Sequence, residues 1–299
     1  MDSAIDGVAL KMREMVEAVG YPFASELFKR LAGGKRLRAK LILMIAGEVP
    51  EAVTLAAVIE LIHAASLLHD DVIDEAQLRR GVASINATEG SKQAVMLGDI
   101  LYSKAFSELT QFDTRIAKTV ADAVTALSVG EMMDVRMAES FNDDETRYLQ
   151  MLYLKTGVLI EAAAKSAALL AGKDAERYAL YGRNLGIAFQ IVDDILDIVS
   201  DEATLGKPAM NDYVEGKCTL PYIYLHRAFN DDDAQRLRAL HARRADDEDV
   251  AWMKAAMQRH GAIEAAYAKA RTLSDEALEA IAGDAALEAV IESLMRRTF

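Results

Sequence analysis

Two short stretches of the sequence, LLHDDVID and IVDDILD, carry aspartates in the same Asp-Asp-x-x-Asp pattern among apolar residues. The six aspartates are Asp70, Asp71, Asp74, Asp193, Asp194 and Asp197. In a helix, residues four apart share a face, so the first and last aspartate of each stretch project together. Like charges at this spacing destabilise a helix, and a cation would offset that cost. Carboxylate oxygens suit Mg²⁺, which also retains waters and binds substrate phosphates. The two stretches therefore predict magnesium sites.

Two other interpretations of the acidic stretches are open. Each could be a solvated acidic patch, although an apolar setting in both copies disfavours this. A carboxylate-bridged di-iron bundle would need paired Glu-x-x-His motifs. Glu60 and His63 form the only such motif in the sequence, so a di-iron site is disfavoured as well.

Basic residues gather near these acids, although the chain as a whole has a net charge of −13. The stretch GGKRLRAK places several cations at a predicted helix start, where backbone N–H groups and arginine forks favour an anion. Further cations follow the acidic stretches or lie near them. The basic residues singled out are Lys35, Arg36, Arg38, Lys40, Arg79, Arg80, Lys155, Lys207 and Lys217. Metal and cations together suit a diphosphate, whereas the overall negative charge argues against nucleic-acid binding.

The elements that must position these residues are helices. The chain of 299 residues has only 4 prolines and 6% aromatic residues, and its apolar residues recur at three- and four-residue spacing. We predict one all-α domain over residues 1–299. The expected helices span about 4–19, 22–31, 35–47, 51–74, 91–110, 114–139, 143–170, 174–199, 217–229, 231–242, 247–259, 261–281 and 284–297. Residues 231–250 are expected to form a solvated peripheral hairpin.

The sequence also carries expectations about location. The N-terminus lacks a basic region followed by an apolar run, and no uncharged run reaches the roughly 18 residues of a membrane span. The single cysteine, Cys218, leaves no internal disulfide. We expect a cytoplasmic protein without a transmembrane span, for which any membrane contact would be peripheral and would serve product release.

The ordered set of motifs resembles the trans-polyprenyl diphosphate synthases. In chain order these motifs are GGKRLR, HDDVIDxxxxRRG, Gly98-Asp99, KTG, GxxFQxxDDxLD, GK and EGKxTLP. The resemblance implies a large helical bundle around a central cavity and a prenyltransferase, usually a homodimer. That enzyme would use two or three Mg²⁺ ions to condense isopentenyl diphosphate with an allylic prenyl diphosphate.

The resemblance also implies roles for single residues. The six aspartates would bind Mg²⁺, with Asp71 and Asp194 assisting. The residues implied to bind isopentenyl diphosphate are Lys35, Arg38, His63 and Arg80. Those implied to bind the allylic diphosphate are Arg79, Lys155, Thr156, Gln190, Lys207 and Lys217. The residues expected to carry catalysis are Asp70, Asp74, Asp193, Lys155, Thr156 and Gln190.

Product length is expected to depend on the residues one turn before Asp70. Short-chain family members resemble each other in placing bulky aromatic residues there, whereas this chain has Ala65 and Ser66. We therefore expect a heptaprenyl to nonaprenyl product, with octaprenyl as the central expectation. Tight helix packing would also explain the small residues. Candidates for the floor of the product channel are Ile62, Tyr102, Phe106, Met132, Met133 and Met137. Many relatives carry Gln where this chain has Asp134.

Three alternatives are kept open. A shorter-chain farnesyl or geranylgeranyl diphosphate synthase would share all the motifs. A class I terpene cyclase would need neither the second aspartate stretch nor the GGKRLR site. A non-catalytic partner subunit would be expected to lose acids from one stretch, and both are intact here.

Overall fold

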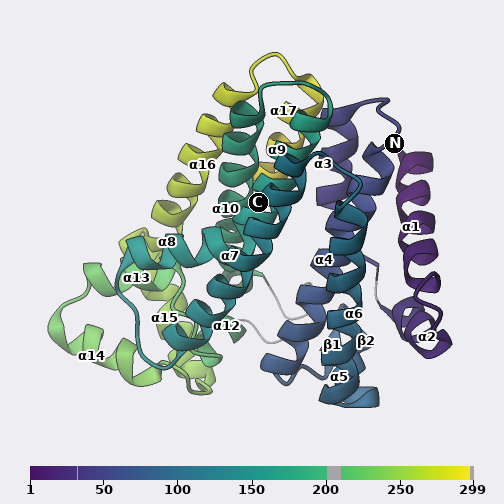
Figure 1. The fold of residues 1–299 in the computed structure, drawn as a ribbon. Coiled ribbons are helices and arrows are strands. Elements are labelled where there is room, and N and C mark those ends of the chain that lie inside the picture. The colour runs from purple at the N-terminus through teal and green to yellow at the C-terminus, as the bar shows by residue number, and fades with distance from the viewer. Residues whose placement is uncertain (32, 201–209, 297–299) are drawn as a thin grey trace. The chain divides into compact units, whose positions relative to one another are not determined.

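The computed structural model describes residues 1–31, 33–200 and 210–296, and it confirms the all-α fold class (Figure 1). The chain forms two compact units. The first comprises Met1–Thr125 and Leu159–Ala179, and the second comprises Ala126–Val158 and Leu180–Phe299. The single domain and the central cavity expected from the sequence stay predictions.

The first unit is built around one long apolar helix, α4 (Ala52–Ile73), which packs against α6, α3 and α1 (Figure 1). Side chains such as Leu55, Ile59 and Ile62 are fully buried along it. The other elements lying wholly or mainly in this unit are α1 (Asp2–Glu17), α2 (Pro22–Arg30), α3 (Leu37–Ala46), β1 (Leu78–Arg79), β2 (Val82–Ala83), α5 (Ile85–Glu89), α6 (Ser91–Leu109) and α9 (Val158–Leu170).

Helix α4 is long and apolar enough to cross a membrane, but 67% of its most apolar window is buried inside the protein. A helix that is apolar on most sides and buried is the core of a folded unit. Among the described residues no other helix meets the same criteria of length and composition.

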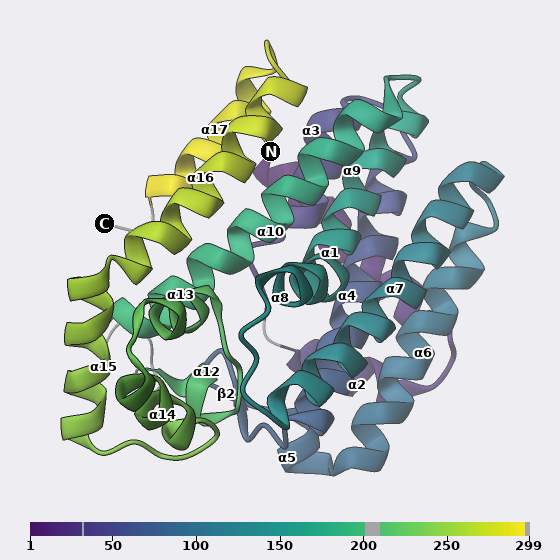
Figure 2. The same ribbon diagram turned by 90° about the vertical axis from the view of Figure 1, so that its left-hand side faces the viewer.

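The second unit carries the C-terminal helices, several of which lie together around α13 (Figure 2). Its elements are α8 (Glu145–Leu152), the π-helix η1 (Tyr153–Gly157), α12 (Asn211–Val214), α13 (Leu220–Ala228), α14 (Asp231–Leu240), α15 (Asp247–His260), α16 (Ala262–Ala280) and α17 (Ala285–Met295). Helix α7 (Thr114–Ala138) is shared between the units, and most of α10 (Ala175–Val199) belongs to the second.

The predicted helices correspond to observed ones, and two differences matter for the site. The helix expected over 143–170 is interrupted by the π-helix that carries Lys155 and Thr156. The break expected after Asp74 contains an antiparallel hairpin, in which Leu78 pairs with Ala83 and Arg79 with Val82. Helix α5 then begins at a capping serine, because the Ser84 hydroxyl accepts the N–H of Ala87.

Candidate active site

The first aspartate cluster lies at the C-terminal end of α4, in the first unit. Asp70 and Asp71 occupy the last turn and Asp74 is the residue that ends the helix. The partial negative charge of a helix C-terminus disfavours carboxylates, so three of them at this position cost stability without a cation. Asp74 is exposed, Asp70 is half-buried and Asp71 is buried. The cluster therefore presents its first and last aspartates outward, as the helical spacing predicts.

The middle aspartate of this cluster has a structural partner. Arg79 Nε donates to Asp71 Oδ1 at 2.6 Å, and the Asp71 carbonyl accepts the N–H of Ala76. Burial raises the pKa of Asp71, and Arg79 acts in the opposite direction. The pair thus joins the hairpin to the end of α4. Arg79 is expected to bind the allylic diphosphate, but in this structure its side chain is paired with the Asp71 carboxylate.

A cationic site in the same unit forms around the GGKRLR stretch. Arg36 has left-handed backbone geometry, with φ of 52°, and its Nη1 lies 3.1 Å from Glu60 Oε2. Glu60 is 3% exposed, and its other oxygen accepts the N–H of Ala39 at 3.1 Å. Glu60 therefore fixes the loop to α4. Lys35 is exposed to solvent.

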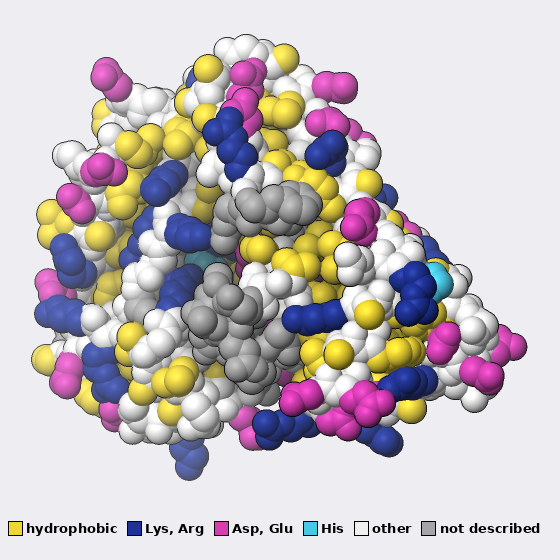
Figure 3. Space-filling view, turned by 180° about the vertical axis from the view of Figure 1, so that it is seen from behind, with side chains coloured by type: hydrophobic (Ala, Val, Ile, Leu, Met, Phe, Trp, Pro, Cys, Tyr) yellow, Lys and Arg dark blue, Asp and Glu magenta, His cyan; other side chains and the backbone are white. Residues whose placement is uncertain are grey.

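This cationic site contains a histidine. Burial, followed by the charges of Arg38, Arg80, Arg79 and Arg36, lowers the pKa of His63 well below its ordinary value. Figure 3 shows several Lys and Arg side chains gathered on one face of the molecule. Within the described residues, the buried Nε of Arg38 has no hydrogen-bond partner. Such a concentration of positive charge is suited to an anion with several oxygens.

The second aspartate cluster lies on α10, in the second unit, and differs from the first in that only its first aspartate is exposed. Asp193 is exposed, whereas Asp194 and Asp197 are 5% and 3% exposed. Asp194 accepts the Tyr148 hydroxyl and also Gln190 Nε2, the latter at 3.0 Å. Burial raises the pKa of Asp194 well above its ordinary value, and the charge of Asp212 adds to this.

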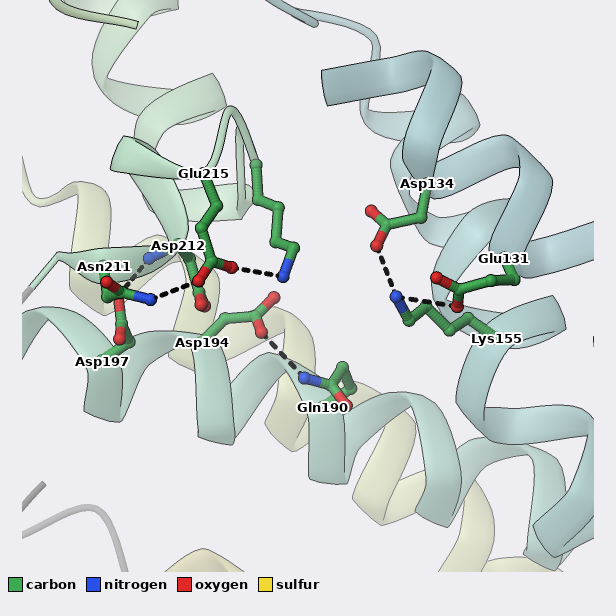
Figure 4. A network of polar contacts seen from close by, with 10 residues as sticks. Glu131, Asp134, Lys155, Gln190, Asp194, Asp197, Asn211, Asp212 and Glu215 are labelled. Carbon is green, nitrogen blue, oxygen red and sulfur yellow. Dashed lines mark hydrogen bonds and ion pairs between the residues drawn. The ribbon is translucent and has the colours of Figure 1, made fainter. Parts of the chain in front are cut away.

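Lys155 lies between two carboxylates of α7 (Figure 4). Its Nζ is 2.9 Å from Glu131 Oε2 and 2.5 Å from Asp134 Oδ2. Burial lowers the pKa of Lys155, but the two carboxylates outweigh this and raise it. A Cβ added at Gly130 would overlap the π-helix backbone, so the glycine is required for this close approach.

One pocket of the second unit gathers several of the predicted residues, although Asp193 and Asp197 are not among those that line it. Thr156 donates to Gln190 Oε1 at 3.2 Å. The pocket is also lined by Asp134, Tyr148, Lys155, Asp194, Asp212 and Lys217, with Thr156 and Gln190. Lys217 pairs with Glu215 at 2.7 Å. The last predicted cation, Lys207, lies outside the described residues.

The expected product-channel residues have mixed outcomes. Ala65 and Ile62 are fully buried in α4, and Ser66 is half-buried, its hydroxyl donating to the His63 carbonyl at 2.9 Å. Met132 is 67% exposed in this chain, and its role in the channel floor stays a prediction. Met132 belongs to an outward stripe of α7, whereas Met133 is half-buried.

The carboxylates of the two aspartate clusters fit a metal ion that takes its remaining ligands from water and substrate. Across residues 1–31, 33–200 and 210–296, no three His, Cys, Asp or Glu side chains are grouped closely enough to hold a metal alone. The carboxylates in question are hard oxygen ligands, and Asp74 and Asp193 are exposed. Mg²⁺ binds in this way, through one or two carboxylates, waters and phosphate oxygens.

Sequence reasoning assigned no role to four residues that the structure places at these sites, namely Glu60, Glu131, Tyr148 and Asp212. Glu60 carried a signal, because it is a charged residue inside an apolar helix. Tyr148 carried none, since its partner is 46 residues away in the sequence.

We expect Tyr148→Phe to show that the tyrosine holds Asp194. Removing one donor from a buried carboxylate should cost about 1–3 kcal/mol of unfolding free energy and lower turnover about tenfold. Tyr181→Phe is the matched control, because the buried Tyr181 hydroxyl donates to the Leu287 carbonyl at 3.1 Å, outside the pocket. Urea unfolding and steady-state assays should show a stability loss in both variants and an activity loss only in Tyr148→Phe. Equal turnover in the two variants would contradict this role.

The all-α fold and these sites define a class of protein, helical enzymes that bind diphosphates with acidic clusters and cations. The chain belongs to the polyprenyl synthetase family, whose model matches residues 22–258. Members of this family use a divalent metal to bind diphosphate. The chain is accordingly a prenyltransferase.

Three similar proteins illustrate the family. The chain is 36% identical over 274 residues to a short chain isoprenyl diphosphate synthase of Methanothermobacter thermautotrophicus, covering 87% of this chain and 84% of that protein. It is 37% identical over 257 residues to the octaprenyl diphosphate synthase of Haemophilus influenzae, covering 83% and 78%. The crystal structure of octaprenyl pyrophosphate synthase from Helicobacter pylori superposes with a TM-score of 0.94 at 40% identity, over 99% of both chains.

Proposed function

We propose that this protein condenses isopentenyl diphosphate with an allylic prenyl diphosphate and makes a long-chain all-trans polyprenyl diphosphate, with octaprenyl as the central expectation. The observation that carries the proposal is that each unit holds an Asp-Asp-x-x-Asp cluster together with its own set of cations. Two diphosphate-bearing substrates require two such anion sites. Family membership and the similarity to octaprenyl synthases support the same conclusion.

The two cationic sites would bind the two substrates. The residues that would hold the diphosphate of isopentenyl diphosphate, in this cation-rich site, are Lys35, Arg38, His63 and Arg80. Lys155, Lys217, Thr156 and Gln190 would hold the allylic diphosphate in the pocket of the second unit. Diphosphate binding would require Lys155 to exchange the carboxylates of α7 for phosphate oxygens.

Asp70, Asp74, Asp193 and Asp197 would hold Mg²⁺. When bound, Mg²⁺ supplies Lewis-acid stabilisation of the charge that develops on the departing diphosphate. The lysines add fixed positive charge around the same group, so that the allylic carbon–oxygen bond can ionise. The isopentenyl double bond then attacks the allylic cation, and a proton leaves to the released diphosphate. Asp71 and Asp194 would hold the surrounding side chains in place, since both are buried and hydrogen-bonded.

Product length tests the long-chain proposal, with farnesyl diphosphate, isopentenyl diphosphate and Mg²⁺ as the assay. We expect Ala65→Phe and Ser66→Phe to shorten the product, because a bulky ring one turn before Asp70 would block an apolar channel running along α4. Products are sized by chromatography. Ser103→Phe on α6 is the matched control, because Ser103 is exposed, and its product should keep the wild-type length. Unchanged products in both α4 variants would place the channel elsewhere.

A shorter-chain synthase is the second candidate, favoured by the similarity to the short chain enzyme of Methanothermobacter. The same assay with wild-type protein separates the two, since a farnesyl synthase would not extend farnesyl diphosphate and a geranylgeranyl synthase would stop after one addition. A terpene cyclase would instead consume allylic diphosphate without isopentenyl diphosphate.

We also propose a homodimer in the cytoplasm. A stripe of exposed apolar side chains on α7 supports self-association: Val129, Met132 and Val135 are 49%, 67% and 45% exposed. These residues recur every three positions, so they share one face of the helix. An apolar stripe of this kind is typical of a subunit interface.

A further inference from the structure

The turn that carries Lys217 is held in place by the chain that follows α14, outside every motif of the family pattern. His241 Nε2 lies 2.8 Å from the carbonyl oxygen of Gly216, the residue before Lys217. A carbonyl can only accept, so Nε2 carries the proton in this bond. One residue further on, the N–H of Ala242 donates to the Tyr213 carbonyl at 3.2 Å. Two successive residues after α14 therefore bind the same turn.

The turn is constrained on its other sides as well. The N–H of Asp212 donates to Asp197 Oδ2 at 3.2 Å, and the N–H of Met210 donates to the Asp197 carbonyl at 2.8 Å. Gly216 has φ of 83°, and a Cβ there would lie 2.6 Å from the Ala138 carbonyl oxygen. The turn is thus pressed between α7 and the second aspartate cluster, and the carbonyl of Gly216 has its donor in His241.

The position of His241 is itself determined by packing. Its ring lies edge-on to Phe141 and Tyr213, each at 5.7 Å between centroids. Tyr213 stacks on Tyr222 at 4.1 Å, and its hydroxyl donates to the Leu237 carbonyl of α14 at 2.7 Å. The residues after α14 were expected to form only a solvated hairpin. Their contacts instead connect α14 to the pocket through buried aromatic side chains.

We propose that His241 is a positioning residue for Lys217, and through it for the diphosphate that the second unit binds. This inference rests on the proposed function. In the structure Lys217 is 26% exposed and pairs with Glu215, two residues earlier on the same turn. A turn free to shift would carry the lysine away from the pocket, whereas the anchored turn keeps Lys217 among the residues that line it. His241 touches no substrate and acts only through the backbone of Gly216.

The test replaces His241 with two amide side chains of different length. His241→Gln places an amide N–H near the position of Nε2 and should retain wild-type behaviour, whereas His241→Asn is too short to reach Gly216. His241→Phe keeps the ring against Phe141 and Tyr213 but loses the donor. We expect the Asn and Phe variants to raise KM for the allylic diphosphate about tenfold, with KM for isopentenyl diphosphate unchanged. His260→Phe is the matched control, because His260 is exposed and contacts Phe229 instead.

Direct binding separates this proposal from the proposed function. Titration calorimetry with inorganic pyrophosphate and Mg²⁺ should show about tenfold weaker binding in His241→Asn and His241→Phe, whether or not the protein has synthase activity. In a Lys217→Ala background the same substitutions should have no further effect. The proposal is overturned by wild-type pyrophosphate binding in a folded His241→Asn or His241→Phe protein. It is also overturned by equal rises in both KM values, or by an undiminished effect in the Lys217→Ala background.

Discussion

Asp70→Asn and Asp193→Asn are each expected to lower kcat/KM by about a thousandfold or more. Each change removes one carboxylate that we propose as a Mg²⁺ ligand, and a metal of this kind supplies several kcal/mol of transition-state stabilisation. About 4 kcal/mol corresponds to a thousandfold in rate. The amide keeps the size of the side chain, and Asp193 is exposed, so the fold should remain intact. Steady-state assays over a range of Mg²⁺ concentrations measure both the activity loss and the larger metal requirement.

The neighbouring aspartates provide the controls. Asp71→Asn and Asp194→Asn keep an oxygen that can accept from Arg79 or Tyr148, so we expect losses nearer tenfold. These two variants should lose more stability than the ligand variants, since both side chains are buried. If all four substitutions reduced activity equally, the division between metal-binding and structural aspartates would be wrong.

The second large effect is expected at Lys155, which we predict to lose about a hundredfold or more in kcat/KM as Lys155→Met. The substitution removes the charge-assisted contact that we propose between Lys155 and the diphosphate. It also leaves the carboxylates of Glu131 and Asp134 without their cation, beside the place where an anion must bind. Like charges in a partly buried site repel one another more strongly than in water. Most of the loss should therefore appear as weaker binding of the allylic diphosphate.

A double substitution tests this explanation. Asp134→Gln removes the negative charge, and in the Lys155→Met background it should restore about tenfold of the lost kcat/KM by removing one repelling charge. Alone, Asp134→Gln should lower KM for the allylic diphosphate, because Lys155 then has one carboxylate fewer to exchange. Lys118→Met, which removes an exposed lysine paired with Asp122 on the same helix α7, is the matched control. A double variant no better than Lys155→Met would contradict the repulsion argument.

Local sequence patterns predict much of the secondary structure of this protein. The long helices appear close to where hydrophobic periodicity places them, because the apolar spacing of a segment such as α4 is a property of neighbouring residues. The sequence indicated only in part which aspartates of each cluster are exposed and which are buried and paired. Helical spacing separates Asp71 from Asp70 and Asp74, but nothing in the sequence indicates that Arg79 would pair with it. The π-helix at Lys155 was also missed, since it depends on the approach of Gly130 from another helix.

By itself the sequence determined the all-α fold class, the two aspartate clusters and the set of cations, because composition and spacing carry that information within a few helical turns. The tertiary structure alone decided which polar groups meet. Tyr148 reaches Asp194 across 46 residues, and His241 reaches Gly216 across 25. Such pairs depend on how separate helices pack, and this packing leaves no repeating pattern in the sequence. The exposure of Met132 on α7 is likewise set by how that helix packs.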